Sequence, residues 1–207
     1  MDARLDSLSD GCLRLLRLVV LLGDDALLPV VARLFGPRSH QISQAVEEGE
    51  GAGIVAVSDA GHLMLHDCWR HAVNERLRGA TRAALAHECA VCLQADRSVE
   101  LPPDRAWRVG QLLLQAGARA EAFRVFSRCG EQMLLRGLAA QAREAFTCAV
   151  DLSDSTVDRA RALCRLADAA CRAGEHEESL SAARLAMDTC GSGSGAAASL
   201  YVSALSD

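Results

Sequence analysis

The stretch HLMLHDCWRHAV (62–73) sets a short apolar run directly against an ionisable pair. The run LML (63–65) favours a short β-strand, whereas the apolar residues after Asp67 recur with the period of an amphipathic helix. His66 and Asp67 therefore stand where a strand changes into a helix. The segments on either side decide which fold this junction belongs to.

The residues before the junction predict three helices and then a β-hairpin. Helical periodicity covers 8–22, 26–35 and 40–53, and glycine or proline interrupts the chain between these segments. IVAV (54–57) and LML (63–65) flank the turn sequence SDAG, a pattern typical of two antiparallel strands. Three helices followed by a hairpin is the element order of a winged helix.

The third predicted helix argues against the DNA binding that winged helices commonly perform. It carries Glu47, Glu48 and Glu50 and contains no lysine or arginine, whereas a helix in the major groove needs basic and amide side chains. The net charge of −5 adds no general attraction to nucleic acid or to an anionic membrane. We therefore predict that this chain does not bind DNA directly.

The second half of the chain is helical in pattern and contains a repeat. Three segments align on a glycine, at 117–129, 137–149 and 174–186. Small residues follow five and twelve positions after each glycine. Small side chains at these positions would let a second helix cross the first at short range. The fifth, ninth and twelfth positions hold Ala122, Ala142 and Ser179, then Phe126, Phe146 and Ala183, then Cys129, Ala149 and Ala186.

This spacing resembles the tetratricopeptide repeat (TPR), in which a helix ends at a glycine and an antiparallel partner carries small and aromatic residues. The glycines lie 20 and then 37 residues apart, and only the second interval approaches the family's period of about 34 residues. The resemblance implies irregular antiparallel helical hairpins. A plain α-helical bundle is the alternative.

We thus expect a mainly α fold in three parts. A winged-helix-like domain with a β-hairpin would cover 1–78, TPR-like antiparallel helical hairpins would cover 79–190, and a Gly/Ser-rich tail would cover 191–207. The 207 residues suffice for one large domain or two small ones.

The junction itself resembles the MHD or LHD motif that closes the winged-helix subdomain of STAND-type signalling ATPases, which include the NB-ARC proteins and the large LuxR-type regulators. LHD (65–67) matches the motif, and several bacterial members continue as HDLxREAV. Arg70, Ala72 and Val73 agree with that continuation, whereas His71 stands where glutamate is usual. The order of winged helix and then helical repeats is also that of the family.

The resemblance implies a nucleotide-sensing role for His66. In such proteins the motif's histidine reaches the β-phosphate of ADP and helps to hold the inactive state, and an imidazole N–H suits a phosphate oxygen. Asp67 would cap the following helix. The alternative is that His66 is a surface or cap histidine and Asp67 a simple N-cap.

Two parts of such regulators are missing from this sequence. All 22 basic residues are arginine, so no phosphate-loop lysine exists, and no GxxxxGK[ST] motif appears. The terminal helix-turn-helix of LuxR-type regulators is also absent. We therefore expect an internal piece of a regulator or a shortened relative, with no cofactor of its own and with ADP or ATP only where a P-loop domain accompanies it.

The resemblance leads to one functional hypothesis and one alternative. The chain would be a regulatory and protein-interaction module that couples nucleotide state to an inducer or protein partner bound on the helical repeats. Trp107 is a candidate partner contact, because aromatic residues are enriched at binding hot spots, although core packing is the commoner role for such a residue. The alternative is a free-standing TPR-like adaptor without nucleotide function.

Enzymatic and metal chemistry are not favoured. The chain lacks a hydrolase elbow and a paired metal motif, and no Schiff-base lysine is available, so we predict that it is not an enzyme. The nine cysteines suggest reduced, structural thiols. HECAVC places His87, Cys89 and Cys92 together, with Cys68 as a conceivable fourth ligand, but a second cluster is missing, and we expect no metal.

The location follows from what the sequence lacks. No apolar run approaches the roughly 18–20 residues of a membrane span, and the N-terminal segment is acidic where a signal peptide is basic. We therefore expect a cytoplasmic protein that does not enter the membrane.

Overall fold

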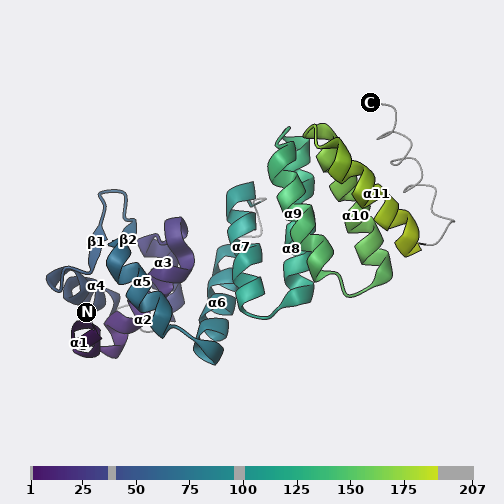
Figure 1. Cartoon of the computed structure of the whole chain (residues 1–207). Coiled ribbons are helices and arrows are strands. Elements are labelled where there is room, and N and C mark those ends of the chain that lie inside the picture. The colour runs from purple at the N-terminus through teal and green to yellow at the C-terminus, as the bar shows by residue number, and fades with distance from the viewer. Residues whose placement is uncertain (1, 37–40, 96–100, 191–207) are drawn as a thin grey trace. The chain divides into compact units, whose positions relative to one another are not determined.

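The computed structural model describes residues 2–36, 41–95 and 101–190 and is mainly helical (Figure 1). Within these residues it contains eleven α-helices and one two-stranded antiparallel sheet, in agreement with the expected class. Two compact units are present, one of Met1–Glu100 with the turn Gln115–Gly117 and one of Leu101–Leu114 with Ala118–Asp207. The tail expected over 191–207 lies outside the described residues.

The first unit holds six helices, a 3₁₀ turn and the sheet among its described residues. The helices are separated by short turns, and the sheet follows the fourth of them. In chain order the elements are α1 (Asp2–Asp6), α2 (Asp10–Leu22), η1 (Gly23–Asp25), α3 (Leu28–Phe35), α4 (Gln41–Gly51), β1 (Val55–Val57), β2 (Leu63–Leu65), α5 (Asp67–Arg76) and α6 (Gly79–Gln94).

Helix α2 is the centre of the first unit. It begins at the N-cap Ser9, whose hydroxyl accepts the Cys12 N–H at 3.2 Å, and ends at Gly23, where φ is 57°. Seven of its thirteen residues are buried, and they face α3, α4, α5, α6 and β2. A helix that is apolar on most of its surface must be enclosed in this way.

The β-hairpin predicted around SDAG is confirmed. Val55 pairs with Leu65 and Val57 with Leu63 in antiparallel register. Leu63 and Leu65 are 2% and 5% exposed and face the core, whereas Met64 between them is 49% exposed, as the alternation of a strand requires. The hairpin therefore delivers the chain to the start of α5 with one face fixed on the core.

Helix α6 packs against α2 and α3, within the first unit. Arg82 joins it to the end of α5, because its guanidinium donates to the carbonyls of Leu77 at 2.7 Å and Asn74 at 2.8 Å. These carbonyls would otherwise lack intrahelical partners. The expected division between residues 78 and 79 thus falls inside a compact unit, and the units divide after Glu100.

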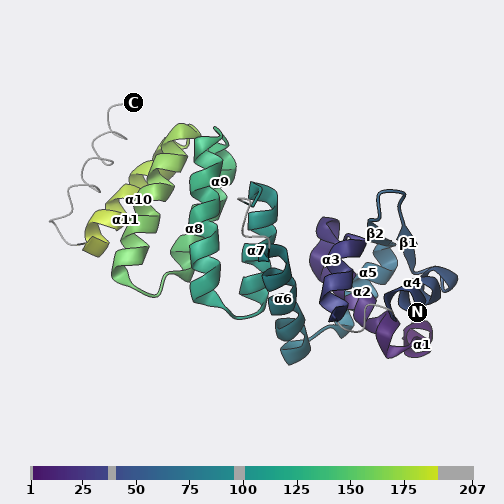
Figure 2. The same cartoon turned by 180° about the vertical axis from the view of Figure 1, so that it is seen from behind.

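The second unit consists of five successive helices, α7 to α11, within the described residues. Consecutive helices from α8 onward lie side by side and alternate in direction (Figures 1 and 2). Their bounds are α7 (Pro103–Gln115), α8 (Arg119–Leu135), α9 (Ala139–Leu152), α10 (Thr156–Arg172) and α11 (His176–Cys190).

Three turns between these helices have the same construction. Gly117, Gly137 and Gly174 have φ of 76°, 75° and 82°, a region that side chains other than glycine rarely adopt. In each turn the N–H of the next residue bonds the carbonyl five residues earlier at 2.9 Å, which is the Schellman arrangement. The glycines found by sequence alignment are therefore the turn residues of helical hairpins.

The repeat positions form the core of the second unit. All nine residues at the fifth, ninth and twelfth positions are buried. The two aromatic members pack on glycines of the preceding helix: a Cβ on Gly110 would lie 2.7 Å from the Phe126 ring, and one on Gly130 would lie 2.7 Å from the Phe146 ring. Helix approach at these points therefore depends on the absence of a side chain.

In the described residues, none of the helices combines the length and the apolar character that crossing a membrane demands.

Candidate functional site

His66 lies at the junction of β2 and α5, where its backbone is held and its side chain is exposed. It is the N-cap of α5, with φ −62° and ψ 141°, and its carbonyl accepts the N–H groups of Trp69 at 2.9 Å and Arg70 at 3.0 Å. Its imidazole makes no hydrogen bond within the described part of the chain. The junction thus offers a fixed point from which an imidazole can reach a group outside the unit.

Asp67 does not cap α5, and the expectation that it would is wrong. His66 has the extended backbone of an N-cap, so Asp67 is the first helical residue, and α5 has no side-chain cap hydrogen bond. Its carboxylate is fully exposed and lies 4.0 Å from the Arg70 guanidinium. A carboxylate in the first turn still favours the helix through the helix dipole.

Trp107 is half-buried on α7, in the second unit. Its ring meets that of Phe126 edge to face, with centroids 5.1 Å apart and planes at 71°. The contact gives Trp107 a packing role, since edge-to-face pairs stabilise by about 0.5–1.5 kcal/mol beyond their burial. Its role as a partner contact stays a prediction.

The acidic residues of α4 divide between packing and exposure. Glu48 is half-buried and accepts the backbone N–H of Ser9 at 2.7 Å, together with the Ser9 hydroxyl. Glu47 and Glu50 are exposed. The described helix therefore presents negative charge, and the prediction that the chain does not bind DNA directly remains untested.

The group His87, Cys89 and Cys92 is not assembled as a metal site. His87 is exposed, whereas Cys89 is fully buried, and burial raises the pKa of its thiol to about 12. The Cys92 thiol lies 3.7 Å from the carbonyl of Val30. Over 2–36, 41–95 and 101–190, no cluster of three or more His, Cys, Asp or Glu side chains could hold a metal ion.

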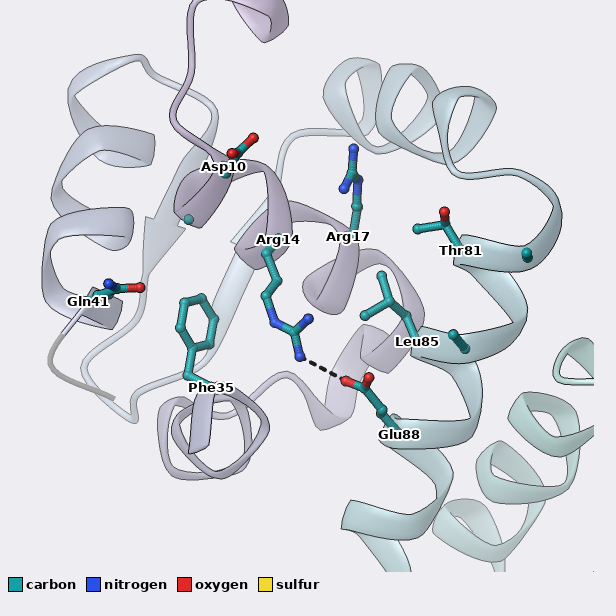
Figure 3. Close-up of a pocket in the computed structure, with 11 residues that line it drawn as sticks. Asp10, Arg14, Arg17, Phe35, Gln41, Thr81, Leu85 and Glu88 are labelled. Atoms are coloured by element: carbon teal, nitrogen blue, oxygen red, sulfur yellow. Dashed lines mark hydrogen bonds and ion pairs between the residues drawn. The ribbon is translucent and has the colours of Figure 1, made fainter. Parts of the chain in front are cut away.

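The first unit contains a pocket that sequence reasoning missed. Its volume is about 840 Å³, and it lies between α2, the end of α3, the start of α4 and α6 (Figure 3). Its labelled residues combine charged, polar and apolar side chains. Those used below are Asp10, Arg14, Arg17, Thr81, Leu85 and Glu88.

Two arginines of α2 line this pocket and differ in their partners. Arg14 donates from Nη2 to the Glu88 carboxylate at 2.8 Å and to the Leu34 carbonyl at 3.1 Å. Arg17, three residues further along α2, is half-buried and has no hydrogen bond or ion pair to any described residue. The available sequence signal was LRLLRLVVLL, in which two arginines interrupt an otherwise apolar helix.

Comparison with protein-family models, with curated proteins and with solved structures yields no match to this chain.

Proposed function

We propose that this chain is the regulatory and protein-interaction module of a STAND-type ATPase or a LuxR-like transcriptional regulator. In this proposal the first unit acts as a winged helix that senses nucleotide state through His66. The helical hairpins of the second unit act as the TPR-like part that binds an inducer or a protein partner. The chain itself carries out no catalysis and supplies no cofactor.

The observation that carries the proposal is the placement of His66. The preceding strand is anchored by the buried Leu63 and Leu65, and the His66 carbonyl accepts two N–H groups of the first turn of α5. The backbone is thus held on both sides while the imidazole is exposed and makes no hydrogen bond within the described residues. A neutral or protonated imidazole so placed can donate to a phosphate oxygen held by a neighbouring domain.

The contacts behind His66 support a coupling role. Trp69 and Val73 of α5 are buried in the first unit, so a displacement of the α5 start would move packed side chains rather than a loose loop. Arg82 ties the end of α5 to α6 through the hydrogen bonds described above. In this proposal, loss of the phosphate contact at His66 shifts α5, and Arg82 carries the shift to α6.

The proposal is tested on the native protein in its cells. The protein is captured with an antibody to residues 101–190, its N-terminus is mapped by mass spectrometry, and co-captured proteins are identified. We expect a P-loop domain on the same polypeptide or on a co-captured ATPase. A native start at Met1 with no associated ATPase would refute the nucleotide role.

The role of His66 is then tested in that complete protein or complex. A hydrogen bond to a charged group contributes about 1.5–3 kcal/mol, so His66→Ala should weaken ADP binding by about tenfold or more and raise basal output. His71→Ala is the matched control, because His71 is an exposed histidine too and lies within α5, five residues after His66. Equal ADP affinity in the two variants would exclude the role assigned to His66.

A free-standing adaptor is the second candidate, and the separate core of the second unit favours it. The nine buried repeat positions enclose that unit's own core. An adaptor would keep partner binding in a fragment of residues 101–190 and would be insensitive to His66→Ala. Partner capture that requires both nucleotide and His66 would decide against it.

A further inference from the structure

Arg17 and the pocket around it form a candidate site that does not depend on the proposed function. Arg17 is half-buried on α2 and is one of the residues that line the pocket in Figure 3. Among the described residues it has neither a carboxylate nor a carbonyl partner. Removing a charged group even partly from water is costly unless a partner compensates, so an arginine in this setting favours a bound anion.

The neighbouring charges leave a positive region at Arg17. Arg14 is neutralised by Glu88 at 2.8 Å, so this pair contributes little net charge. Asp10 is the other acid among the described lining residues, but it stands two helical turns before Arg17, about 10 Å along the axis of α2. That distance is comparable to the screening length of about 8 Å at physiological salt, so the Asp10 charge is largely screened at Arg17.

The wall opposite Arg17 supplies apolar contact and a hydroxyl. Helix α6 contributes Leu85, which is buried, together with the small side chains Ala80 and Ala84 and the exposed hydroxyl of Thr81. In Figure 3, Arg17 extends from α2, and Thr81 and Leu85 extend from α6. The volume of about 840 Å³ lies in the range of small-molecule sites.

We propose that this pocket binds a small organic oxyanion, a carboxylate or phosphate monoester with an apolar body. Arg17 is the principal anion contact, because a guanidinium presents paired N–H donors that match the two oxygens of such a group. Thr81 is a second donor, and Leu85 and Ala84 contact the apolar body.

The experiment is an NMR titration of the full chain with three probes: benzoate, phenyl phosphate and inorganic phosphate. We expect saturable shifts of the backbone amides of α2 and α6 that line the pocket, with benzoate or phenyl phosphate binding at least tenfold more tightly than inorganic phosphate. Which of the two organic probes binds more tightly distinguishes a carboxylate site from a phosphate site. No saturable shift with either probe, or equal affinity for inorganic phosphate, overturns the proposal.

Three variants assign the binding to Arg17. Arg17→Gln should weaken the preferred probe at least tenfold, whereas Arg124→Gln, an exposed arginine of α8, should leave the affinity within twofold. Glu88→Gln should strengthen binding several-fold, because it removes a negative charge and leaves Arg14 without its ion-pair partner. Equal affinity of wild type and a folded Arg17→Gln, or weaker binding by Glu88→Gln, would place the anion elsewhere.

Discussion

Gly130→Ala tests whether the helices of the second unit meet at glycine because no side chain fits there. Gly130 lies in the middle of α8, where alanine would ordinarily be the better residue. A Cβ at this position would lie 2.7, 2.8 and 2.9 Å from three carbons of the Phe146 ring. Phe146 is 1% exposed, so its ring has no room to move away into solvent.

The magnitude follows from two opposing effects. Replacing glycine with alanine inside a helix favours the folded state by about 0.5–1 kcal/mol. Inserting a methyl group into a packed core costs about 1–3 kcal/mol. Because the Cβ contacts fall below 3.0 Å on a buried ring, the packing cost dominates. We expect Gly130→Ala to lower the free energy of unfolding of the second unit by about 1–2 kcal/mol.

The assay is urea unfolding followed by the fluorescence of Trp107, the tryptophan of the second unit. The reference protein and every variant carry Trp69→Phe, so that the tryptophan of the first unit does not contribute to the fluorescence. A double-mutant cycle with Phe146→Leu identifies the cause, because the smaller side chain makes room for the methyl group. The double variant should be more stable than the sum of the two single effects by about 1 kcal/mol.

Two results would refute this reasoning. A neutral or stabilising Gly130→Ala would mean that the helices can separate at negligible cost. Additive effects of Gly130→Ala and Phe146→Leu would mean that the destabilisation does not arise at the ring.

Two further predictions concern buried polar atoms. Ser179 is 1% exposed, and its hydroxyl donates to the carbonyl of Ala167 at 2.9 Å. Ser179→Ala should therefore lower the free energy of unfolding in urea by about 0.5–1 kcal/mol, whereas Ser181→Ala, at an exposed serine, should leave it unchanged. Equal effects of the two substitutions would argue against the hydrogen bond. Burial raises the pKa of the Cys89 thiol from 9.0 to about 12. Between these two values the folded state keeps the proton that the unfolded state releases. The stabilisation present below pH 9 is therefore lost as the pH rises toward 12. Between pH 8 and pH 10, Cys89→Ala should therefore lose about 1 kcal/mol less stability than wild type. A Cys89→Ala protein with the wild-type pH slope would contradict the assignment.

The elements near the junction could be predicted because their signals are local. Two short apolar runs, at 54–57 and 63–65, around the turn sequence SDAG predict a hairpin, and the hairpin is present. The aligned glycines predict tight turns, and all three have the left-handed backbone that favours glycine. These features depend on residues within a few positions of one another.

The details of the site depended on contacts between distant residues. Arg14 and Glu88 are 74 positions apart, and only the packing of α6 on α2 and α3 brings them together. Arg17, on the same helix as Arg14, has no partner in the described residues. Packing also decided that α6 belongs to the first unit, since the sequence pattern of this helix fits either unit. Even the N-cap of α5 was decided by backbone geometry, because both His66 and Asp67 precede the buried face of that helix.

The sequence by itself therefore determined the three helices and the hairpin before the junction and the glycine turns of the second half, since hydrophobic period and turn residues encode local backbone structure. The tertiary structure alone decided which charges meet, because a long-range ion pair leaves no periodic trace in the chain. It also decided how closely the helices approach, since the space at Gly110 and Gly130 is filled by rings that lie 16 positions further along the chain.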